Sequence, residues 1–226
     1  MEYRGGSQIA RRASALVSGF WQNRRAIAAV EAALIMPIFL TFLLGSYEAI
    51  RYVNMSRRLT TLANSMATMI TTRVQPVNGN GVLFAFNSAM VIFPDVLSDP
   101  ARGSTNWWNY LSMTISNVLF TPTVAGCTTG CTYKANIDWS IGANASRSCT
   151  IAPTLVADST ISSLTTLPAD VFNPGSLIVV DLSYPFVPLF GARYIPSITI
   201  HRSAYLQPRY MSSVSMVNTG GTYGKC

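Results

Sequence analysis

The sequence has few charged residues and a single histidine. Only 11% of its 226 residues are charged, whereas about a quarter is usual in a soluble globular protein. The six carboxylates after Arg73 are scattered singly, and the lone histidine is His201. No G-x-S-x-G, HExxH, P-loop or G-x-G-x-x-G motif is present. These absences predict a protein that is not an enzyme and holds neither a metal nor an organic cofactor.

The formal net charge of +7 is distributed unevenly along the chain. Residues 1–73 contain nine arginines and three acidic residues, whereas residues 74–226 contain seven basic and six acidic residues. A nucleic-acid-binding domain needs a basic face, so the near-neutral C-terminal part argues against a nucleic-acid partner. The arginines lie instead on both sides of residues 26–50, where they can set membrane topology and meet anionic headgroups.

The longest apolar stretch, residues 26–50, has no charge between Glu31 and Glu48. A helix rises about 1.5 Å per residue, so the uncharged part is roughly 24 Å long. The hydrocarbon core of a bilayer is about 30 Å thick, so a spanning helix must include one or both carboxylates near its ends. We interpret residues 26–50 as a transmembrane helix, and the alternative is a buried core helix.

The flanks of this stretch predict a single-pass topology. Five arginines precede it and three follow closely, so the positive-inside rule places the N-terminus in the cytoplasm and the chain after Ile50 outside. Residues 1–25 are then a cytoplasmic leader. The alternative is an ordinary secretory signal, but the apolar run exceeds the usual length of about 7–15 residues and no Ala-x-Ala site follows it.

Beyond Ile50 the apolar residues recur every three or four positions, on one face of a helix: Met55, Leu59, Leu62, Met66 and Met69. This pattern predicts one helix from about Arg24 to about Arg73, in which residues 51–74 form an amphipathic continuation. A turn-forming sequence from Gln75 ends the helix. Residues 82–97 are predicted to form a second, short helix.

Residues 75–226 are predicted to form an extracytoplasmic α+β domain. Apolar and polar residues alternate, as in half-buried strands, over residues 111–116, 133–141, 177–184 and 195–206. The expected fold class is therefore α+β. A long N-terminal helix, with a transmembrane half and an amphipathic half, packs on a small, mostly antiparallel, β-rich domain.

All four cysteines lie on the expected outer side of the membrane: Cys127, Cys131, Cys149 and Cys226. In an oxidising compartment this even number predicts one or two disulfides. The spacing of Cys127 and Cys131 is typical neither of a zinc site nor of a thioredoxin motif. Three pairings are possible. We favour a bond from Cys127 or Cys131 to Cys149, with Cys226 paired inside the chain or with another subunit.

The segment RRAIAAVEAALIMPIFLTFLLGSYEAIR resembles the N-terminal signature of the TadE/TadF/TadG-like pseudopilins of the tight-adherence (Tad, Flp pilus) machinery. That signature usually reads Arg-Arg-Gly, four residues, Glu, and an apolar run with proline, glycine and Glu-x-x-Arg. The corresponding residues stand here in the same order: Glu31, Pro37, Gly45, Glu48 and Arg51. The similarity covers Arg24 to about Thr68, and a looser similarity to TadG-type C-terminal domains covers residues 177–209.

The resemblance implies a minor pseudopilin in the bacterial inner membrane that acts in pilus assembly, secretion or surface adherence, with other Tad proteins as partners. It also implies that a prepilin peptidase cuts between Ala26 and Ile27 and leaves Glu31 at the fifth position of the mature chain. This sequence has Ala26 where the family usually has glycine, and Ala32 where phenylalanine often sits. An uncut chain would remain a single-span anchor.

Glu31 is the strongest candidate functional residue, because an ionisable group within a membrane segment is by default a site. The alternative is that the Glu31 side chain reaches the cytoplasmic surface of the membrane and has no function. The alternative function is a single-span, membrane-tethered periplasmic binding module for a cell-wall polymer or a protein partner. Trp107, Trp108 and Trp139 would be its candidate contacts, although core or membrane-interface positions explain these residues better.

Overall fold

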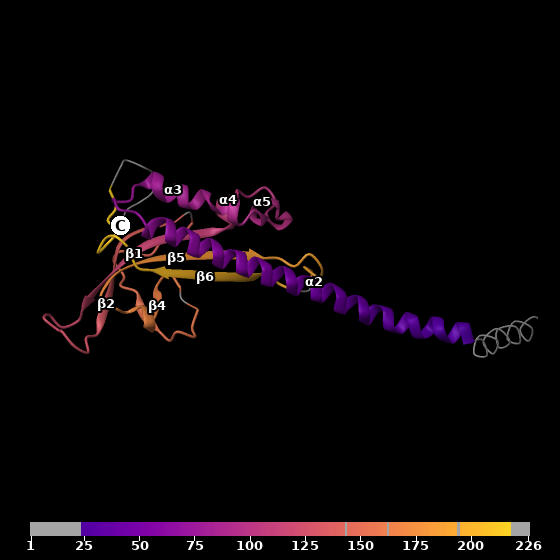
Figure 1. Cartoon of the computed structure of the whole chain (residues 1–226). Helices are drawn as coiled ribbons and strands as arrows, with labels where there is room; N and C mark the ends of the chain where they lie inside the picture. Colours follow the sequence, from indigo (N-terminus) through magenta and orange to yellow (C-terminus); the bar gives the residue numbers. More distant parts are fainter. Residues whose placement is uncertain (1–23, 143, 162, 194, 218–226) are drawn as a thin grey trace, which may run out of the picture. The chain divides into compact units, whose positions relative to one another are not determined.

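The computed structural model describes residues 24–142, 144–161, 163–193 and 195–217, and it divides into two compact units, Met1–Ile50 and Arg51–Cys226. The helical elements (Figure 1) are α2 (Arg24–Thr71), α3 (Gly79–Asn87), α4 (Ala89–Ile92), α5 (Asp95–Ser98), η1 (Pro100–Arg102), α6 (Trp107–Tyr110) and η2 (Ala169–Val171). The strands are β1 (Ser112–Pro122), β2 (Tyr133–Gly142), β3 (Thr154–Val156), β4 (Thr166–Pro168), β5 (Gly175–Phe186) and β6 (Ile198–Leu206).

The long helix predicted from the sequence is confirmed as α2, which spans 48 residues. In the second unit the helix packs on the sheet through the predicted stripe, in which Met55, Leu59, Leu62 and Met66 are buried. Met69, the last residue of the stripe, is partly buried against the same core. The α+β fold class is therefore confirmed, because the apolar face of the helix is buried against one face of the sheet.

The second helical segment differs from the predicted single helix over residues 82–97. It begins earlier, where the side chain of Asn78 accepts a hydrogen bond of 2.8 Å from the backbone of Gly81 and caps α3. It is also divided into the three short helices α3, α4 and α5. Pro94 stands between the last two, and proline lacks the N–H donor that a continuous helix needs.

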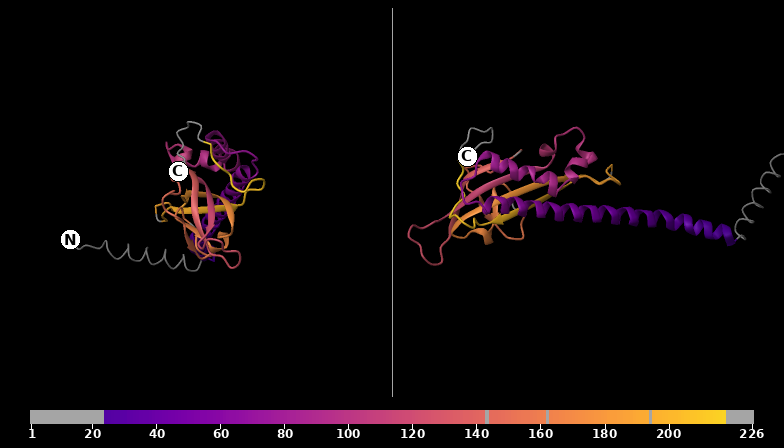
Figure 2. Two further views of the ribbon diagram at one scale, coloured as in Figure 1. Left: turned by 90° about the vertical axis from the view of Figure 1, so that its left-hand side faces the viewer. Right: turned by 45° about the horizontal axis from the view of Figure 1, so that its top comes forward.

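Four of the strands form one antiparallel sheet in the order β2-β1-β5-β6. Each of the four predicted strands is present, and β1 runs six residues beyond its predicted end at Ser116, as far as Pro122. Strands β3 and β4, which are three residues long and pair in parallel, were not predicted from the sequence. Figure 2 shows the loop between β1 and β2 extending from one end of the sheet.

Each face of the sheet carries its own hydrophobic core. The larger core lies between the sheet and the helices α2 and α3, and it includes Leu62, Phe86 and Val180. The smaller core lies on the opposite face, where Val118 and Val179 meet the β4–η2 segment. The two faces follow from the pleat, since neighbouring residues of a strand point to opposite sides.

Shortening one buried residue of the helix stripe should destabilise the domain. Leu62 is fully buried, so Leu62→Ala is expected to lower the free energy of unfolding by about 2–5 kcal/mol through lost burial and the cavity that remains. The measurement is denaturant unfolding of the full chain in detergent, followed by tryptophan fluorescence. Asn64→Ala is the matched control on the exposed face and should change the free energy by less than about 0.5 kcal/mol. Equal effects of the two variants would contradict the assigned face.

Candidate functional site

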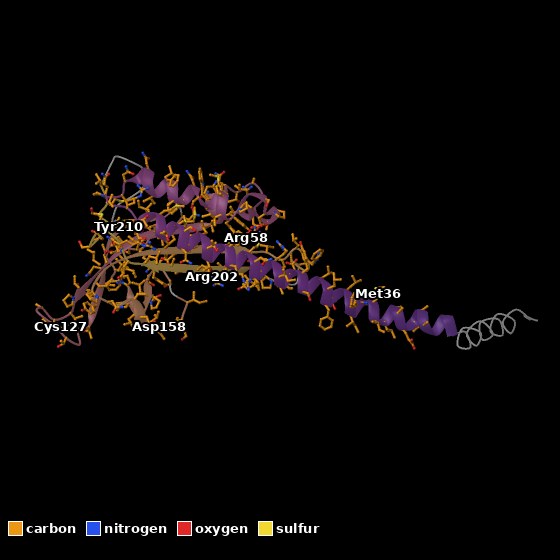
Figure 3. The ribbon with its side chains drawn as sticks, viewed as in Figure 1. Met36, Arg58, Cys127, Asp158, Arg202 and Tyr210 are labelled. Atoms are coloured by element: carbon orange, nitrogen blue, oxygen red, sulfur yellow. A yellow bond between two sulfur atoms is a disulfide. The ribbon has the colours of Figure 1, made fainter. Side chains whose placement is uncertain are left out.

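The first part of α2 exposes a continuous apolar surface. Eleven large apolar side chains between residues 30 and 50 are exposed: Val30, Leu34, Ile35, Met36, Ile38, Phe39, Leu40, Phe42, Leu43, Tyr47 and Ile50. Met36, labelled in Figure 3, is 57% exposed. Contact of apolar surface with water costs about 25 cal/mol per Å². An apolar surface of this extent therefore indicates contact with a membrane or with other proteins.

The length of the helix decides between these environments. Within the described residues, Ala28–Thr71 is the one helix that is long and apolar enough to cross a bilayer, and its most apolar stretch is not buried. A core helix of a soluble domain would be covered by its own chain. The uncovered helix fits a single-pass membrane protein with a C-terminal domain.

The predicted assembly residues lie along this helix. Glu31 is exposed and Glu48 is half-buried, and the helical rise places them about 26 Å apart. Pro37 lies inside the helix. A Cβ added to Gly45 would meet no atom within 4 Å, so the fold of a single chain does not require a glycine there.

Arg51, the last residue of the predicted signature, contacts the C-terminal domain. Its guanidinium carbon lies 5.3 Å from the centre of the Phe186 ring, at the end of β5. Tyr52 meets the same ring edge-on, with the ring centres 5.5 Å apart. The helix is therefore attached to the sheet from the first residues after Ile50, through a cation–π contact and an aromatic pair.

The predicted cleavage position lies at the edge of the described structure. The backbone of Ala26 and Ile27 belongs to α2, and the side chains of residues 24–27 lie outside the described part. Most of the predicted leader, residues 1–23, also lies outside the described residues. Cleavage after Ala26 therefore stays a prediction.

Comparison with protein families matches residues 26–67 to the family described as TadE-like protein. The N-terminal helix is TadE-like. The matched stretch contains all five signature residues from Glu31 to Arg51. The family match suggests a membrane protein that is associated with the Tad pilus system. Comparison with curated proteins gave no match, and neither did comparison with solved structures.

The favoured pairing of Cys127 or Cys131 with Cys149 is wrong. Cys127 and Cys131 are bonded to each other, with their Cα atoms 5.8 Å apart, in the loop between β1 and β2 (Cys127 is labelled in Figure 3). Gly126 and Gly130 have φ values of 77° and 64°. Such values suit glycine, and they turn the loop so that the two cysteines meet. Cys149 is disulfide-bonded as well, and Cys226 lies outside the described residues.

The tryptophans proposed as ligand contacts occupy different environments. Trp139 is fully buried, and its Nε1 donates a hydrogen bond of 2.7 Å to the carbonyl of Val214. Trp139 is therefore a core residue and cannot contact a ligand. Trp107 is partly buried against the larger core, whereas Trp108 is 48% exposed. Of the three, Trp139 is therefore wrong as a candidate contact, and the core position expected for it is confirmed.

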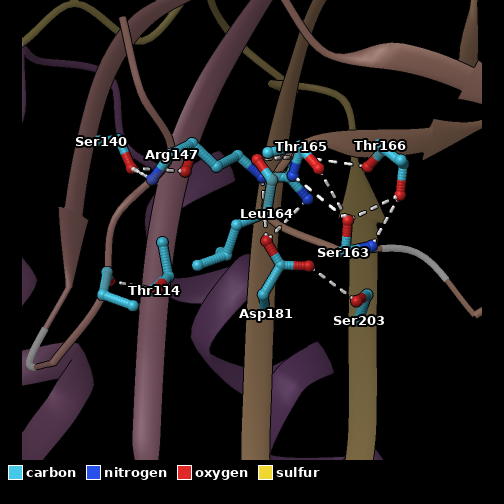
Figure 4. Close-up of polar contacts among 11 residues, drawn as sticks. Thr114, Ser140, Arg147, Ser163, Leu164, Thr165, Thr166, Asp181 and Ser203 are labelled. Carbon is cyan, nitrogen blue, oxygen red and sulfur yellow. Dashed lines mark hydrogen bonds and ion pairs between the residues drawn. The ribbon is translucent and has the colours of Figure 1, made fainter. Parts of the chain in front are cut away.

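The C-terminal domain contains a buried ion pair that the sequence did not reveal. Arg147, from the loop between β2 and β3, donates from Nε to Oδ2 of Asp181 at 2.9 Å, and its Nη2 lies 2.8 Å from the same oxygen. Nη1 donates to the carbonyls of Leu164 and Thr166 at 3.2 Å and 3.3 Å. Ser203 donates to Oδ1 of Asp181 at 2.7 Å. Figure 4 shows the guanidinium between Asp181 on β5 and the chain at Leu164.

This ion pair fixes a loop to the second face of the sheet. The side chain of Arg147 is fully buried, and that of Asp181 is 13% exposed. The backbone N–H of Arg147 also donates to Ser140 on β2 at 2.8 Å. Because the charges are paired and hydrogen-bonded, their burial is tolerated. Among the described residues no group of three or more His, Cys, Asp or Glu side chains could hold a metal ion.

Breaking this ion pair should cost far more than breaking an exposed one. Arg147→Met leaves Asp181 buried without its cation, so the free energy of unfolding is expected to fall by about 3–5 kcal/mol. Arg58→Met is the matched control, because Arg58 pairs with Asp95 at 2.6 Å while its side chain is 52% exposed. Its removal should cost no more than about 1 kcal/mol. Denaturant unfolding measures both, and equal losses would contradict the structural role of Arg147.

Two tyrosines of the larger core share one carboxylate. Tyr184 donates a short hydrogen bond to Oδ2 of Asp99, and Tyr110 donates to the carbonyl of Pro185 at 3.2 Å. Burial, followed by the charge of Asp99, raises the pKa of Tyr110 to about 12. Burial and the hydrogen bond to Asp99 raise the pKa of Tyr184 well above its ordinary value. Both hydroxyls therefore stay protonated at pH values where unfolded tyrosines ionise.

The raised tyrosine pKa values predict a loss of stability in alkali. The two protonated tyrosines contribute fully to the free energy of unfolding below the pKa of an unfolded tyrosine, about 10. Their contribution is lost as the pH rises above that value, because the unfolded chain then releases protons that the folded chain retains. Between pH 10 and 12, unfolding free energies of the wild type should fall more steeply than those of Tyr184→Phe. The difference in slope should be at most about 1.4 kcal/mol per pH unit. Identical slopes would contradict the assignment.

Proposed function

We propose that the protein is a membrane-anchored minor pseudopilin that acts in assembly of the Tad (Flp) pilus, in the associated secretion or in surface adherence. The main support for this proposal is that the family match and the exposed apolar part of α2 cover the same residues. The TadE-like match covers residues 26–67, and the exposed apolar part of α2, with Glu31 near its start, lies within it. The TadE-like family is a pilus-related structural family, which agrees with a role that is not enzymatic.

The proposed topology places the N-terminus in the cytoplasm and the C-terminal domain outside the bacterial inner membrane. The arginines that precede the helix support this direction. The bond between Cys127 and Cys131 supports an oxidising compartment for the domain. The parts of the chain are then a leader (residues 1–25), a membrane helix (26–50), an amphipathic helix (51–74) and an extracytoplasmic domain (75–226).

Glu31 is the proposed assembly residue. An ionised carboxylate is costly inside a bilayer, so a compensating cation from another chain would stabilise the assembled state. After cleavage between Ala26 and Ile27, the new N-terminal amine of a neighbouring subunit can supply that cation. The attraction between the two charges is larger in a medium of low dielectric constant than in water. The carboxylate thus favours association within the membrane over an isolated helix.

Other residues of the helix suit close contact between chains. A Cβ added to Gly45 would meet no atom of the chain within 4 Å, and small residues in membrane helices let neighbouring backbones approach. Pro37 removes one backbone hydrogen bond, which membrane helices tolerate when neighbouring helices satisfy the freed group. We therefore propose Pro37, Gly45 and Glu48 as packing positions beside other pilus-assembly subunits.

The test of this function is Glu31→Gln in the native host. The variant keeps the shape of the side chain and removes the charge, so we expect normal amounts of protein in the membrane and a loss of pili and of surface attachment. Asp158→Asn is the control. It removes an exposed charge while its retained Oδ1 can still accept the hydrogen bond that Asp158 accepts from the backbone of Asp170, at 2.9 Å in the structure. It should leave pili unchanged.

Mass spectrometry of the mature N-terminus separates the two forms of the proposal. A chain that begins at Ile27 supports processing by a prepilin peptidase, whereas an intact leader identifies a single-span anchor. Pili that persist unchanged in Glu31→Gln, with the variant present at normal levels, would refute the assembly role of the carboxylate.

A further inference from the structure

The second face of the sheet has an open groove that neither the TadE-like helix nor the pilus role explains. The smaller core covers one end of this face. At the other end lies a groove of about 670 Å³, whose lining includes Ser112, Ser183, His201, Ile161 and Leu164. Its volume falls within the range of about 300–1,000 Å³ that is usual for small-ligand sites. Strands β1, β5 and β6 form its floor.

Two rows of polar side chains cross the floor of the groove. In the first row Thr114, Asp181 and Ser203 are partners across the three strands. All three are engaged within the protein. Thr114 donates to the carbonyl of Ala145 at 2.6 Å, Ser203 donates to Asp181, and Asp181 pairs with Arg147. This row therefore holds the groove together, and its charge is already neutralised.

The second row offers hydrogen-bonding groups to a ligand. Ser112, Ser183 and His201 are cross-strand partners on β1, β5 and β6, and all three line the groove. Within the described residues, neither serine hydroxyl and neither nitrogen of the imidazole makes a hydrogen bond. Neighbouring strands are about 4.8 Å apart, so three unused polar groups follow one another at steps similar to the length of a sugar ring.

The walls of the groove are fixed before any ligand binds. One wall is the segment that carries Leu164 and Thr165, and the buried guanidinium of Arg147 holds the carbonyl of Leu164 at 3.2 Å. Ser163 adds hydrogen bonds to Thr166, at 2.8 Å from its backbone N–H and 3.0 Å between the hydroxyls. Figure 4 shows these contacts around the guanidinium. A preformed wall lowers the entropic cost of binding.

The chemistry of the groove selects the kind of ligand. Hydroxyl and imidazole groups can each donate or accept, which matches ligands whose own hydroxyls do both. Strand β5 is paired on both sides along this stretch, and β1 is paired on both sides from Thr114 onward, so a ligand that crosses these strands meets mainly side chains and not unpaired backbone. An extended peptide would instead add beside β6, the edge strand of the floor. The buried arginine is paired with Asp181, so the groove presents no free arginine for an anion.

We propose that this groove binds a neutral saccharide chain, which crosses strands β1, β5 and β6 along the row of Ser112, Ser183 and His201. The apolar side chains of Ile161 and Leu164 would contact the less polar faces of the sugar rings. The proposal does not depend on the pilus role, because the groove lies wholly within the C-terminal domain.

Binding is tested on the full chain in nanodiscs or in a detergent without a sugar headgroup. The probes are tri-N-acetylglucosamine and maltotriose, followed by saturation-transfer NMR and calorimetry. We expect at least one of them to bind. Ser183→Leu fills the floor and should abolish binding, whereas His201→Ala should weaken it about threefold to tenfold, as expected for one lost hydrogen bond.

The control is Thr128→Leu, the same kind of change at an exposed position in the loop between β1 and β2. It should leave the affinity unchanged, and the unfolding transition of each variant confirms that the domain is folded. The proposal is overturned if neither saccharide binds. It is also overturned if tetraglycine binds as tightly as the saccharides, or if Ser183→Leu is folded and binds them like the wild type.

Discussion

The architecture of the chain follows from one feature, the apolar surface that the first part of α2 leaves exposed. Between residues 30 and 50 most of the large apolar side chains of α2 are exposed, and from Met55 onward one apolar stripe packs against the larger core. The two halves of one continuous helix are therefore suited to two different surroundings. Its first half requires a medium without water, and its second half requires a partner surface on one side only. The sheet supplies that surface, and a membrane is the medium that fits the first half.

The sheet in turn divides the C-terminal domain into a structural face and a partly open face. The structural face is covered by α2 and α3 and contains the larger core. The opposite face is covered at one end by the smaller core, and at the other end it forms an open groove whose wall is held by the pair of Arg147 and Asp181. In this arrangement the TadE-like helix fits an anchoring role, and the open face carries the saccharide site that we propose. Anchoring and the proposed recognition thus use different elements and different physical forces.

The sequence was informative where a pattern is local and periodic. The stripe from Met55 to Met69 and the alternation in four strands predicted α2 and the main sheet, because helices and strands have fixed side-chain periods. Strands β3 and β4 are too short for a period to show. The disulfide depended on two glycines with positive φ, and the groove depended on strand register. Arg147 and Asp181 are 34 residues apart, so only the fold could bring them together, although a carboxylate within the apolar run of β5 was a signal.

In the proposed assembly, the end of the exposed helix that carries Glu31 makes a contact with another pilus-assembly subunit inside the membrane. This contact is tested most directly by a photo-activated crosslinking residue at position 34, in native membranes, because Leu34 is 68% exposed and lies one turn from Glu31. We expect crosslinks to a pilus-assembly protein or to a second copy of the chain, and we expect them to be lost when Glu31 is replaced by glutamine. Crosslinks to lipid alone, or protein crosslinks that are unaffected by the loss of the charge, would contradict the proposed contact.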